Sequence, residues 1–343
     1  MKRLRILLLP FAIIYGLVVA IRNILFNKGI LSSYTIPRKS IVVGNLSAGG
    51  TGKTPLVDYI LNHFKELNIS TSALSRGYGR STKGVLIGNS ESTSEQIGDE
   101  PLLYQNHHGD QVNVVVAEKR LAGVERILKN FPENKLIVLD DAFQHRAVTA
   151  GLSILVTQFN DLYCDDFMLP AGNLREFKSG AKRAHILVIS KCPPNLDDEA
   201  KKVIIERINF PGKHVFFSSI AYGDLVPFNS SVIAKATTIL LVTGIGNPKP
   251  LIDQLSRFSK VQHLAFKDHH DFTASDIELI HDKFGKFASD EKIIVTTEKD
   301  FMRLKKFDEV FDASHAWFYQ PIKIEIDQQK IFNNLLEEYV GKI

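Results

Sequence analysis

A glycine-rich segment near residue 50 has the residue types that bind the phosphates of a nucleotide. Residues 44–54 read Gly-Asn-Leu-Ser-Ala-Gly-Gly-Thr-Gly-Lys-Thr and directly follow the largely apolar run 40–43. A strand that enters such a turn and continues into a helix brings backbone N–H groups, a lysine and the positive end of a helix to one point. The first glycine of the usual G-x-x-x-x-G-K-[ST] pattern is replaced by Ser47. The predicted phosphate-binding residues are Gly49, Gly50, Thr51, Gly52, Lys53, Thr54 and Pro55.

Two consecutive aspartates are the predicted magnesium ligands. Asp140 and Asp141 follow the run 135–139, which has the composition of a buried strand. Phosphoryl transfer needs a metal ion, and the hydroxyl of Thr54 is expected to be a second ligand. Successive strand residues point to opposite faces, so one aspartate could bind the metal directly and the other through water or a neighbour. The pair could instead only cap the following turn.

Two acidic or histidine-rich segments are candidates for the group that deprotonates an acceptor. Gly98 and Pro101 restrict the backbone around Asp99 and Glu100 at a predicted helix start, where an aspartate could equally be an ordinary N-cap. Residues 267–272 read Lys-Asp-His-His-Asp-Phe, the densest cluster of histidine and aspartate. This cluster could bind a metal, relay a proton, or form the polar start of a helix.

Three further segments have the composition of ligand-binding loops. Residues 75–80 read Ser-Arg-Gly-Tyr-Gly-Arg and directly follow a predicted strand, where an open α/β sheet binds its ligands. Their two arginines suit an anionic substrate. Residues 170–176 and 244–248 are also rich in glycine, asparagine and proline. Ordinary turns would use the same residue types.

The order of apolar runs predicts an α/β fold with a P-loop NTPase-like parallel sheet flanked by helices. The predicted strands of the first part are 41–44, 70–75, 112–117, 135–140, 152–157, 185–190 and 214–218, with helices at 54–66, 99–107, 118–130 and 197–209. A second, smaller α/β unit is expected from about residue 221, with strands at 238–243, 261–266, 293–296 and 316–319 and helices at 248–258, 274–286 and 328–340. The predicted domains are an N-terminal membrane-associated helix (1–30), a kinase core (31–220) and a C-terminal α/β subdomain (221–343).

The N-terminus contains an apolar run of marginal length for a membrane helix. Residues 6–21 carry no charge and have basic residues on both sides. A spanning helix usually needs about 20 apolar residues. The run could be a cleaved signal peptide, a buried core helix, or a helix that spans the membrane or lies at its surface. A protein with a phosphate-binding loop needs ATP, and export would carry it away from ATP. We therefore favour a membrane-attached helix over a signal peptide.

Composition narrows the possible classes of protein. The chain has 343 residues, 44% of them hydrophobic, and a net charge of only +4, so we expect no nucleic-acid partner. Cys164 and Cys192 stand far apart and outside any metal-binding pattern, which indicates free thiols in a reducing compartment.

Taken together, these segments resemble the tetraacyldisaccharide 4′-kinases, also called lipid A 4′-kinases. The matching segments, in family order, are 44–45, 49–55, 75–79, 98–101, 140–145, 170–176, 244–248, 268–272 and 297–300. The family usually has glycine after the aspartate pair, where this chain has Ala142. The resemblance implies a kinase on the cytoplasmic face of a Gram-negative inner membrane. It would transfer the γ-phosphate of ATP, with Mg²⁺, to the 4′-hydroxyl of a tetraacylated glucosamine disaccharide 1-phosphate, without an obligate protein partner.

The resemblance also implies roles for individual residues. Asp99 would accept the hydroxyl proton, with His269 rather than His270 as its partner, and Lys53 would contact the transferred phosphate. Asp99 and His269 belong to different predicted units, so the resemblance implies a site that both units share. The implied metal ligands are Thr54, Asp140, Asp141 and Glu100, and the implied headgroup contacts are Arg76, Tyr78, His145, Asn173, Arg175 and Glu176.

The main alternative is a membrane-associated P-loop switch ATPase or GTPase that acts on a protein partner. Guanine recognition normally uses an Asn/Thr-Lys-x-Asp run, and the nearest strings, at 190–193 and 298–300, lack that order. Related switch ATPases carry a lysine where this chain has Ala48. Both observations favour the kinase.

Overall fold

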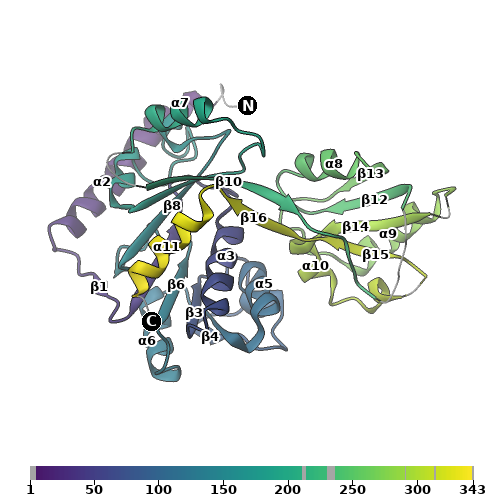
Figure 1. The fold of residues 1–343 in the computed structure, drawn as a ribbon, viewed down its shortest axis with the longest axis horizontal. Helices are drawn as coiled ribbons and strands as arrows, with labels where there is room; N and C mark the ends of the chain where they lie inside the picture. Colours follow the sequence, from purple (N-terminus) through teal and green to yellow (C-terminus); the bar gives the residue numbers. More distant parts are fainter. Residues whose placement is uncertain (1–4, 211–213, 230–235, 290, 313, 342–343) are drawn as a thin grey trace. The chain divides into compact units, whose positions relative to one another are not determined.

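The chain folds into two α/β units, which are described separately (Figure 1). The computed structural model describes residues 5–210, 214–229, 236–289, 291–312 and 314–341. The first unit contains Met1–Ile220 together with Ile324–Ile343, and the second contains Ala221–Lys323.

The first unit is built on a nine-stranded sheet with the order β16-β10-β9-β8-β2-β6-β3-β5-β4. The strands from β10 to β5 in this order pair in parallel, and β4 is antiparallel to β5. Their bounds are β2 (Lys39–Gly44), β3 (Thr71–Ser75), β4 (Leu86–Ile87), β5 (Val112–Val116), β6 (Leu136–Asp140), β8 (Leu152–Gln158), β9 (Ile186–Ser190), β10 (His214–Tyr222) and β16 (Ile322–Ile326). A small separate pair consists of β1 (Tyr34–Thr35) and β7 (Val148–Thr149).

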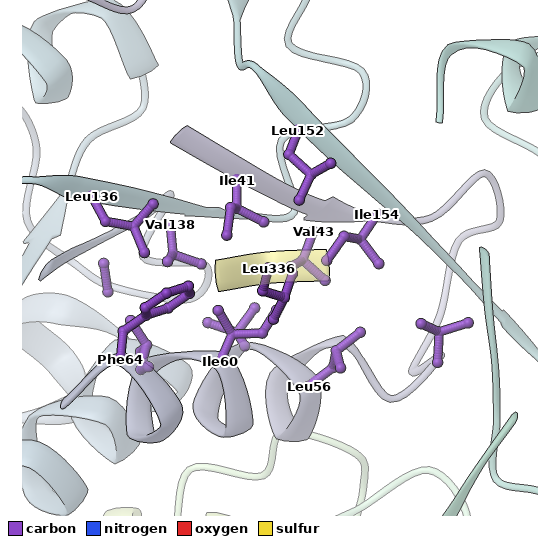
Figure 2. Close-up of a cluster of buried hydrophobic side chains, with 14 of the residues drawn as sticks. Ile41, Val43, Leu56, Ile60, Phe64, Leu136, Val138, Leu152, Ile154 and Leu336 are labelled. Carbon is purple, nitrogen blue, oxygen red and sulfur yellow. The ribbon is translucent and has the colours of Figure 1, made fainter. Parts of the chain in front are cut away.

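Helices cover both faces of this sheet, because alternate strand residues belong to hydrophobic cores on opposite faces. In β2, Ile41 and Val43 pack in the core that includes α3 and α11, whereas Val42 packs in the core that includes α6. Figure 2 shows the first of these cores, in which Leu56, Ile60 and Phe64 line one side of α3 at intervals of four residues. The helices are α3 (Lys53–Glu66), α4 (Ser94–Ile97), α5 (Asp99–His108), α6 (Arg120–Asn130), α7 (Asp198–Ile208) and α11 (Gln329–Val340).

The C-terminal segment differs from our expectation that the second unit extends to residue 343. Residues Ile324–Ile343 group with the first unit instead. Strand β16, which we did not predict, pairs with β10 at the edge of the nine-stranded sheet and buries Ile324 and Ile326. Helix α11 then buries Phe332 and Leu336 in the core that contains α3, so its apolar face is used by the first unit.

The second unit contains a five-stranded sheet with the order β11-β15-β14-β12-β13. The last four strands in this order are parallel, and β11 is antiparallel to β15. The strands are β11 (Val226–Pro227), β12 (Thr238–Thr243), β13 (Lys260–Ala265), β14 (Lys292–Thr297) and β15 (Trp317–Gln320), and the helices are α8 (Lys249–Leu255), α9 (Ala274–Gly285) and α10 (Glu298–Leu304). The short helix α10 was not predicted.

The N-terminal apolar run forms a 3₁₀ turn (Ile6–Leu8) and the long helix α2 (Leu9–Asn27). By length and composition this helix could cross a membrane. Of its residues, Ala12 and Gly16 are the ones that are buried, and most of its large apolar side chains are exposed. The possibility of a buried core helix is therefore wrong.

Candidate active site

The glycine-rich loop joins β2 to α3 and leaves the start of α3 open to a ligand. Gly52 precedes α3 with φ of 81°, Gly49 has φ of 118°, and a Cβ added at Gly49 or Gly50 would meet nothing within 4 Å. Neighbouring strands fix the loop, since the Ser190 hydroxyl donates to the Thr51 carbonyl at 2.6 Å. The first N–H groups of α3 have no side-chain cap, so they are available to an anion.

Lys53 and Asp141 form one charged group at the edge of the sheet. The Lys53 Nζ lies 3.6 Å from Asp141 Oδ1, and Arg175 donates two hydrogen bonds to the same carboxylate, at 2.9 and 3.2 Å. Burial alone would raise the pKa of Asp141, but Lys53 and Arg175 outweigh it and lower this pKa. Asp141 is thus a paired carboxylate that holds two cations.

Asp140 is in the opposite situation, although it is the adjacent residue. Its Oδ2 accepts from Tyr104 at 3.2 Å and from Ser75 at 3.4 Å, whereas its buried Oδ1 has no hydrogen-bond partner among the described residues. Burial, together with the negative charges of Glu100 and Asp141, raises the pKa of Asp140 to about 7. Such an unsatisfied carboxylate oxygen is what a bound cation would satisfy.

The start of α5 brings Asp99 and Glu100 to this edge. Glu100 Oε1 accepts from the Thr54 hydroxyl at 3.0 Å, which links the first turns of α5 and α3. Gly98 has φ of 93°, and a Cβ there would lie 3.0 Å from the Tyr78 carbonyl. The glycine therefore lets the turn before α5 pack against the loop that follows β3. Thr54, Glu100 and Asp140 together offer the hard oxygen ligands that Mg²⁺ prefers.

Three of the predicted headgroup residues, Arg76, Tyr78 and His145, are exposed or partly buried. Arg76 and Tyr78 are exposed after β3, with Tyr78 71% exposed. His145 is partly buried, and burial followed by the charges of Arg120 and Arg76 lowers its pKa to about 4, so its ring is neutral at pH 7.

Arg120, at the start of α6, is a functional candidate that we missed. Its side chain is buried and donates to the carbonyl oxygens of Ala117 at 2.6 Å and Asp140 at 3.1 Å. The sequence carries little signal for it, because Arg120 lies in the predicted helix 118–130 and belongs to no motif.

Side chains of the segment 170–176 form hydrogen bonds and ion pairs with other residues of the first unit. Asn173 Oδ1 accepts from Arg5 at 3.0 Å. Glu176 is only 2% exposed and accepts from Arg183 at 2.8 Å and from Gln144 at 3.0 Å. Glu176 therefore has structural partners in the first unit, and its contact with a headgroup stays a prediction.

In the second unit, His269 and His270 have different surroundings. The ring of His270 stacks on Phe266 at 4.7 Å, meets Phe272 edge-on, and has Nε2 2.9 Å from Asp276 Oδ2. His269 has φ of 58°, and its ring lies beside Arg303 and Lys299. His270 is thus partly buried against Phe266 and Phe272 and paired with Asp276, which favours His269 as the candidate for chemistry.

Asp58 of α3 forms a third cluster with His107 and His108 at the end of α5. Asp58 Oδ1 lies 2.9 Å from a ring nitrogen of each histidine. Burial would raise the pKa of Asp58, but the two histidine hydrogen bonds outweigh it and lower this pKa to about 2. The donor set resembles a metal site, but a ligating His108 would carry its proton on Nδ1, which is buried without a partner in the described residues. The cluster therefore fits a clamp between α3 and α5 better than a metal site.

Comparisons with known proteins agree with this geometry. A profile of the tetraacyldisaccharide-1-P 4′-kinase family matches residues 4–340. The chain is 41% identical to the tetraacyldisaccharide 4′-kinase of Bacteroides thetaiotaomicron, over 97% of this chain and 92% of that protein. It is also 41% identical to the protein of the same name from Flavobacterium johnsoniae, over 99% of this chain and 98% of that protein.

A solved structure supports the same grouping. The crystal structure of LpxK from Aquifex aeolicus in complex with ATP matches with a TM-score of 0.77 and 28% identity, over 98% of this chain and all of that chain. The phosphate-binding loop, the carboxylates beside it and these relatives lead to one conclusion: the chain belongs to the tetraacyldisaccharide-1-P 4′-kinase family.

Proposed function

We propose that this protein is an ATP-dependent kinase that transfers the γ-phosphate of ATP to the 4′-hydroxyl of a tetraacylated glucosamine disaccharide 1-phosphate in lipid A biosynthesis. Family membership supports the reaction and the nucleotide. The observation that carries it is the arrangement beside the glycine-rich loop, where Lys53 lies 3.6 Å from Asp141 and the neighbouring Asp140 keeps a buried oxygen without a partner in the described residues. The switch ATPase or GTPase is not favoured.

Thr54 and Asp140 are the first choices to hold Mg²⁺, with Glu100 beside them. When bound, Mg²⁺ neutralises charge on the phosphates and orients them for displacement. Asp141 is already paired with Lys53 and Arg175, so in this proposal it positions those cations and contacts the metal through water. Lys53 then contacts the phosphate that is transferred.

Asp99 is the proposed acceptor of the hydroxyl proton, with His269 as its partner. Asp99 stands at the first residue of α5, next to Glu100, which is hydrogen-bonded to the phosphate-loop residue Thr54. The core packing of His270 supports His269 as the partner. Arg76, Tyr78 and His145 are the proposed headgroup contacts, with Arg175 and Asn173 next to them.

Helix α2 is proposed to lie along the cytoplasmic surface of the inner membrane rather than to cross it. The helix and the residues just before it contact the rest of the first unit at several points. Arg5, before the helix, donates to Asn173; Tyr15 donates to the Arg175 carbonyl at 3.1 Å; and Arg146 donates to Asn27, the last residue of the helix, at 2.7 Å. A spanning helix would have to break these bonds, whereas a surface helix keeps them and places its exposed apolar side in lipid.

The proposed activity is tested with γ-labelled ATP and detergent-purified protein, with and without the disaccharide 1-phosphate acceptor. Label should enter the lipid only with acceptor and Mg²⁺ present. Asp99→Asn should abolish most transfer, and the matched control Asp110→Asn, at an exposed position just beyond α5, should not. ATP hydrolysis that is independent of the acceptor would contradict the proposal and favour the switch ATPase.

A further inference from the structure

One nitrogen of the His269 imidazole contacts a buried arginine, Arg303. Arg303 Nη2 lies 3.0 Å from His269 Nδ1, and Arg303 is only 5% exposed. The backbone of His269 is fixed as well, since its N–H donates to the Gly244 carbonyl at 3.0 Å and its φ is 58°. Both the direction and the rotation of this ring are therefore set by the second unit.

Arg303 is itself fixed by a fully buried carboxylate. Its Nη1 lies 3.1 Å from Asp300 Oδ1, and Asp300 is 0% exposed. Asp300 also accepts from the Gly244 N–H at 2.9 Å and from the Thr297 hydroxyl at 2.7 Å. A chain of hydrogen bonds thus runs from Asp300 through Arg303 to the ring of His269. Asp300 fixes it to Gly244 at the end of β12 and to Thr297 at the end of β14.

This chain determines which nitrogen of the ring carries the proton. A guanidinium only donates hydrogen bonds, so the nitrogen that faces Arg303 must accept. A neutral ring has one acceptor nitrogen, which places its proton on Nε2. Lys299 Nζ lies 3.2 Å from Nε2 and also only donates, so the two cations compete for one acceptor.

Burial decides this competition in favour of Arg303. Arg303 is buried and paired with Asp300, whereas Lys299 is partly exposed on a flexible side chain and can turn to solvent. Asp268 also lies near Nε2, with its Oδ1 3.9 Å away. Once Lys299 turns to solvent, the Nε2 side of the ring can donate to an acceptor.

We propose that Arg303 is a positioning residue that locks His269 as the Nε2–H tautomer, so that the ring presents a hydrogen-bond donor to a carboxylate. This inference rests on the proposed function in one respect, namely that the carboxylate is Asp99. A donor from His269 would orient the carboxylate of Asp99 and leave its second oxygen to accept the hydroxyl proton. Arg303 would act only through His269, without touching the substrate.

The first test is the ¹⁵N NMR spectrum of histidine-labelled full-length protein, with the signals of His269 identified by their loss in His269→Gln. The expected spectrum shows an unprotonated Nδ1 and a protonated Nε2. In Arg303→Met the two tautomers should mix. A protonated Nδ1 in the unsubstituted protein would overturn the inference, and this measurement needs neither activity nor a variant of Arg303.

The second test is kinetic. Arg303→Met should lower kcat by about 10- to 100-fold with little change in the KM for ATP, and Arg303→Lys should restore part of the loss. Arg257→Met, which removes an exposed arginine of the same unit, should leave kcat unchanged. A folded Arg303→Met protein with unchanged kcat would overturn the positioning role.

The two tests separate this inference from the proposed function. Absence of lipid phosphorylation in the unsubstituted protein would remove the kinase proposal and leave the NMR result to decide the tautomer. Normal kinase activity together with a protonated Nδ1 would remove only the inference about Arg303.

Discussion

In both units, charged groups lie at the carboxyl ends of the parallel strands, but the two sets of groups have opposite character. In the first unit, the adjacent carboxylates Asp140 and Asp141 differ, since Asp141 pairs with cations and Asp140 keeps a buried oxygen without a partner in the described residues. In the second unit, Lys299 and Arg303 converge on the ring of His269. The first edge thus has an unsatisfied acceptor oxygen, whereas the second has two cationic donors beside one ring.

The largest expected effects come from one substitution on the nucleotide side of the transfer and one on the acceptor side. Lys53→Ala should abolish both ATP binding and transfer, because it removes the cation at the glycine-rich loop. Asp99→Ala should lower transfer by about 10²- to 10⁴-fold and leave nucleotide binding nearly intact, as expected for a lost general base. Labelled transfer and calorimetric ATP binding measure the two effects. Equal loss of ATP affinity in both variants would contradict the role of Asp99.

The adjacent aspartates should differ in stability as well as in activity. Asp141→Asn should destabilise the metal-free protein by about 1 kcal/mol, because it leaves Lys53 and Arg175 without their partly solvated counter-ion. Asp140→Asn should leave the stability unchanged or raise it, because it removes a buried charge with an unsatisfied oxygen. Both should lose activity. Urea unfolding without Mg²⁺ makes the comparison, and equal destabilisation would show that Asp140 is also paired in solution.

The clamp at Asp58 should make stability fall in acid. Its pKa is lowered from 3.8 to about 2, so the unfolded chain binds more protons than the folded one as the pH drops through this range. The contribution of Asp58, roughly 2 kcal/mol, is therefore complete above about pH 4 and is lost toward pH 2. Unfolding of Asp58→Asn should differ from the parent at pH 6 and converge with it near pH 2. A difference that persists at pH 2 would contradict this assignment.

The smallest effect concerns the histidine pair. His270→Gln should cost about 1 kcal/mol of stability through the lost contacts with Phe266 and Asp276, with activity retained. His269→Gln should show the reverse pattern, with lower kcat and near-normal stability. Thermal unfolding and kinase assays on the same preparations distinguish the two, and a reversed result would move the proposed partner of Asp99 to His270.

Local patterns were sufficient to predict most of the fold. The longer parallel strands of both sheets were predicted, because short apolar runs are local signals. The two-residue edge strands β4 and β11 were not predicted. Strand β16 was missed although Ile-Lys-Ile-Glu-Ile alternates as a half-buried strand does. Its pairing with β10 joins distant parts of the chain, which no local signal predicts. The same cause led to the wrong expectation for residues 324–343.

The site was predicted by residue type but not by pairing. Sequence spacing marked Asp140 and Asp141 equally, and only the contacts of Arg175 distinguish them. The ion pair between Glu176 and Arg183, seven residues further along, could not be read from the sequence either. Arg120 was missed because a lone arginine after a strand carries no motif.

Helix α2 rests on the first unit at Gly16, where a Cβ would lie 2.8 Å from the ring of Phe177. The segment that contains Phe177 also contains Arg175, whose carbonyl accepts from Tyr15 of the helix. In the proposed arrangement α2 lies in lipid while it contacts this loop, and the enzyme is confined to two dimensions. Its turnover then depends on the mole fraction of acceptor within the bilayer and not on the bulk concentration, so diluting the acceptor with inert lipid slows the reaction even when its total amount is unchanged.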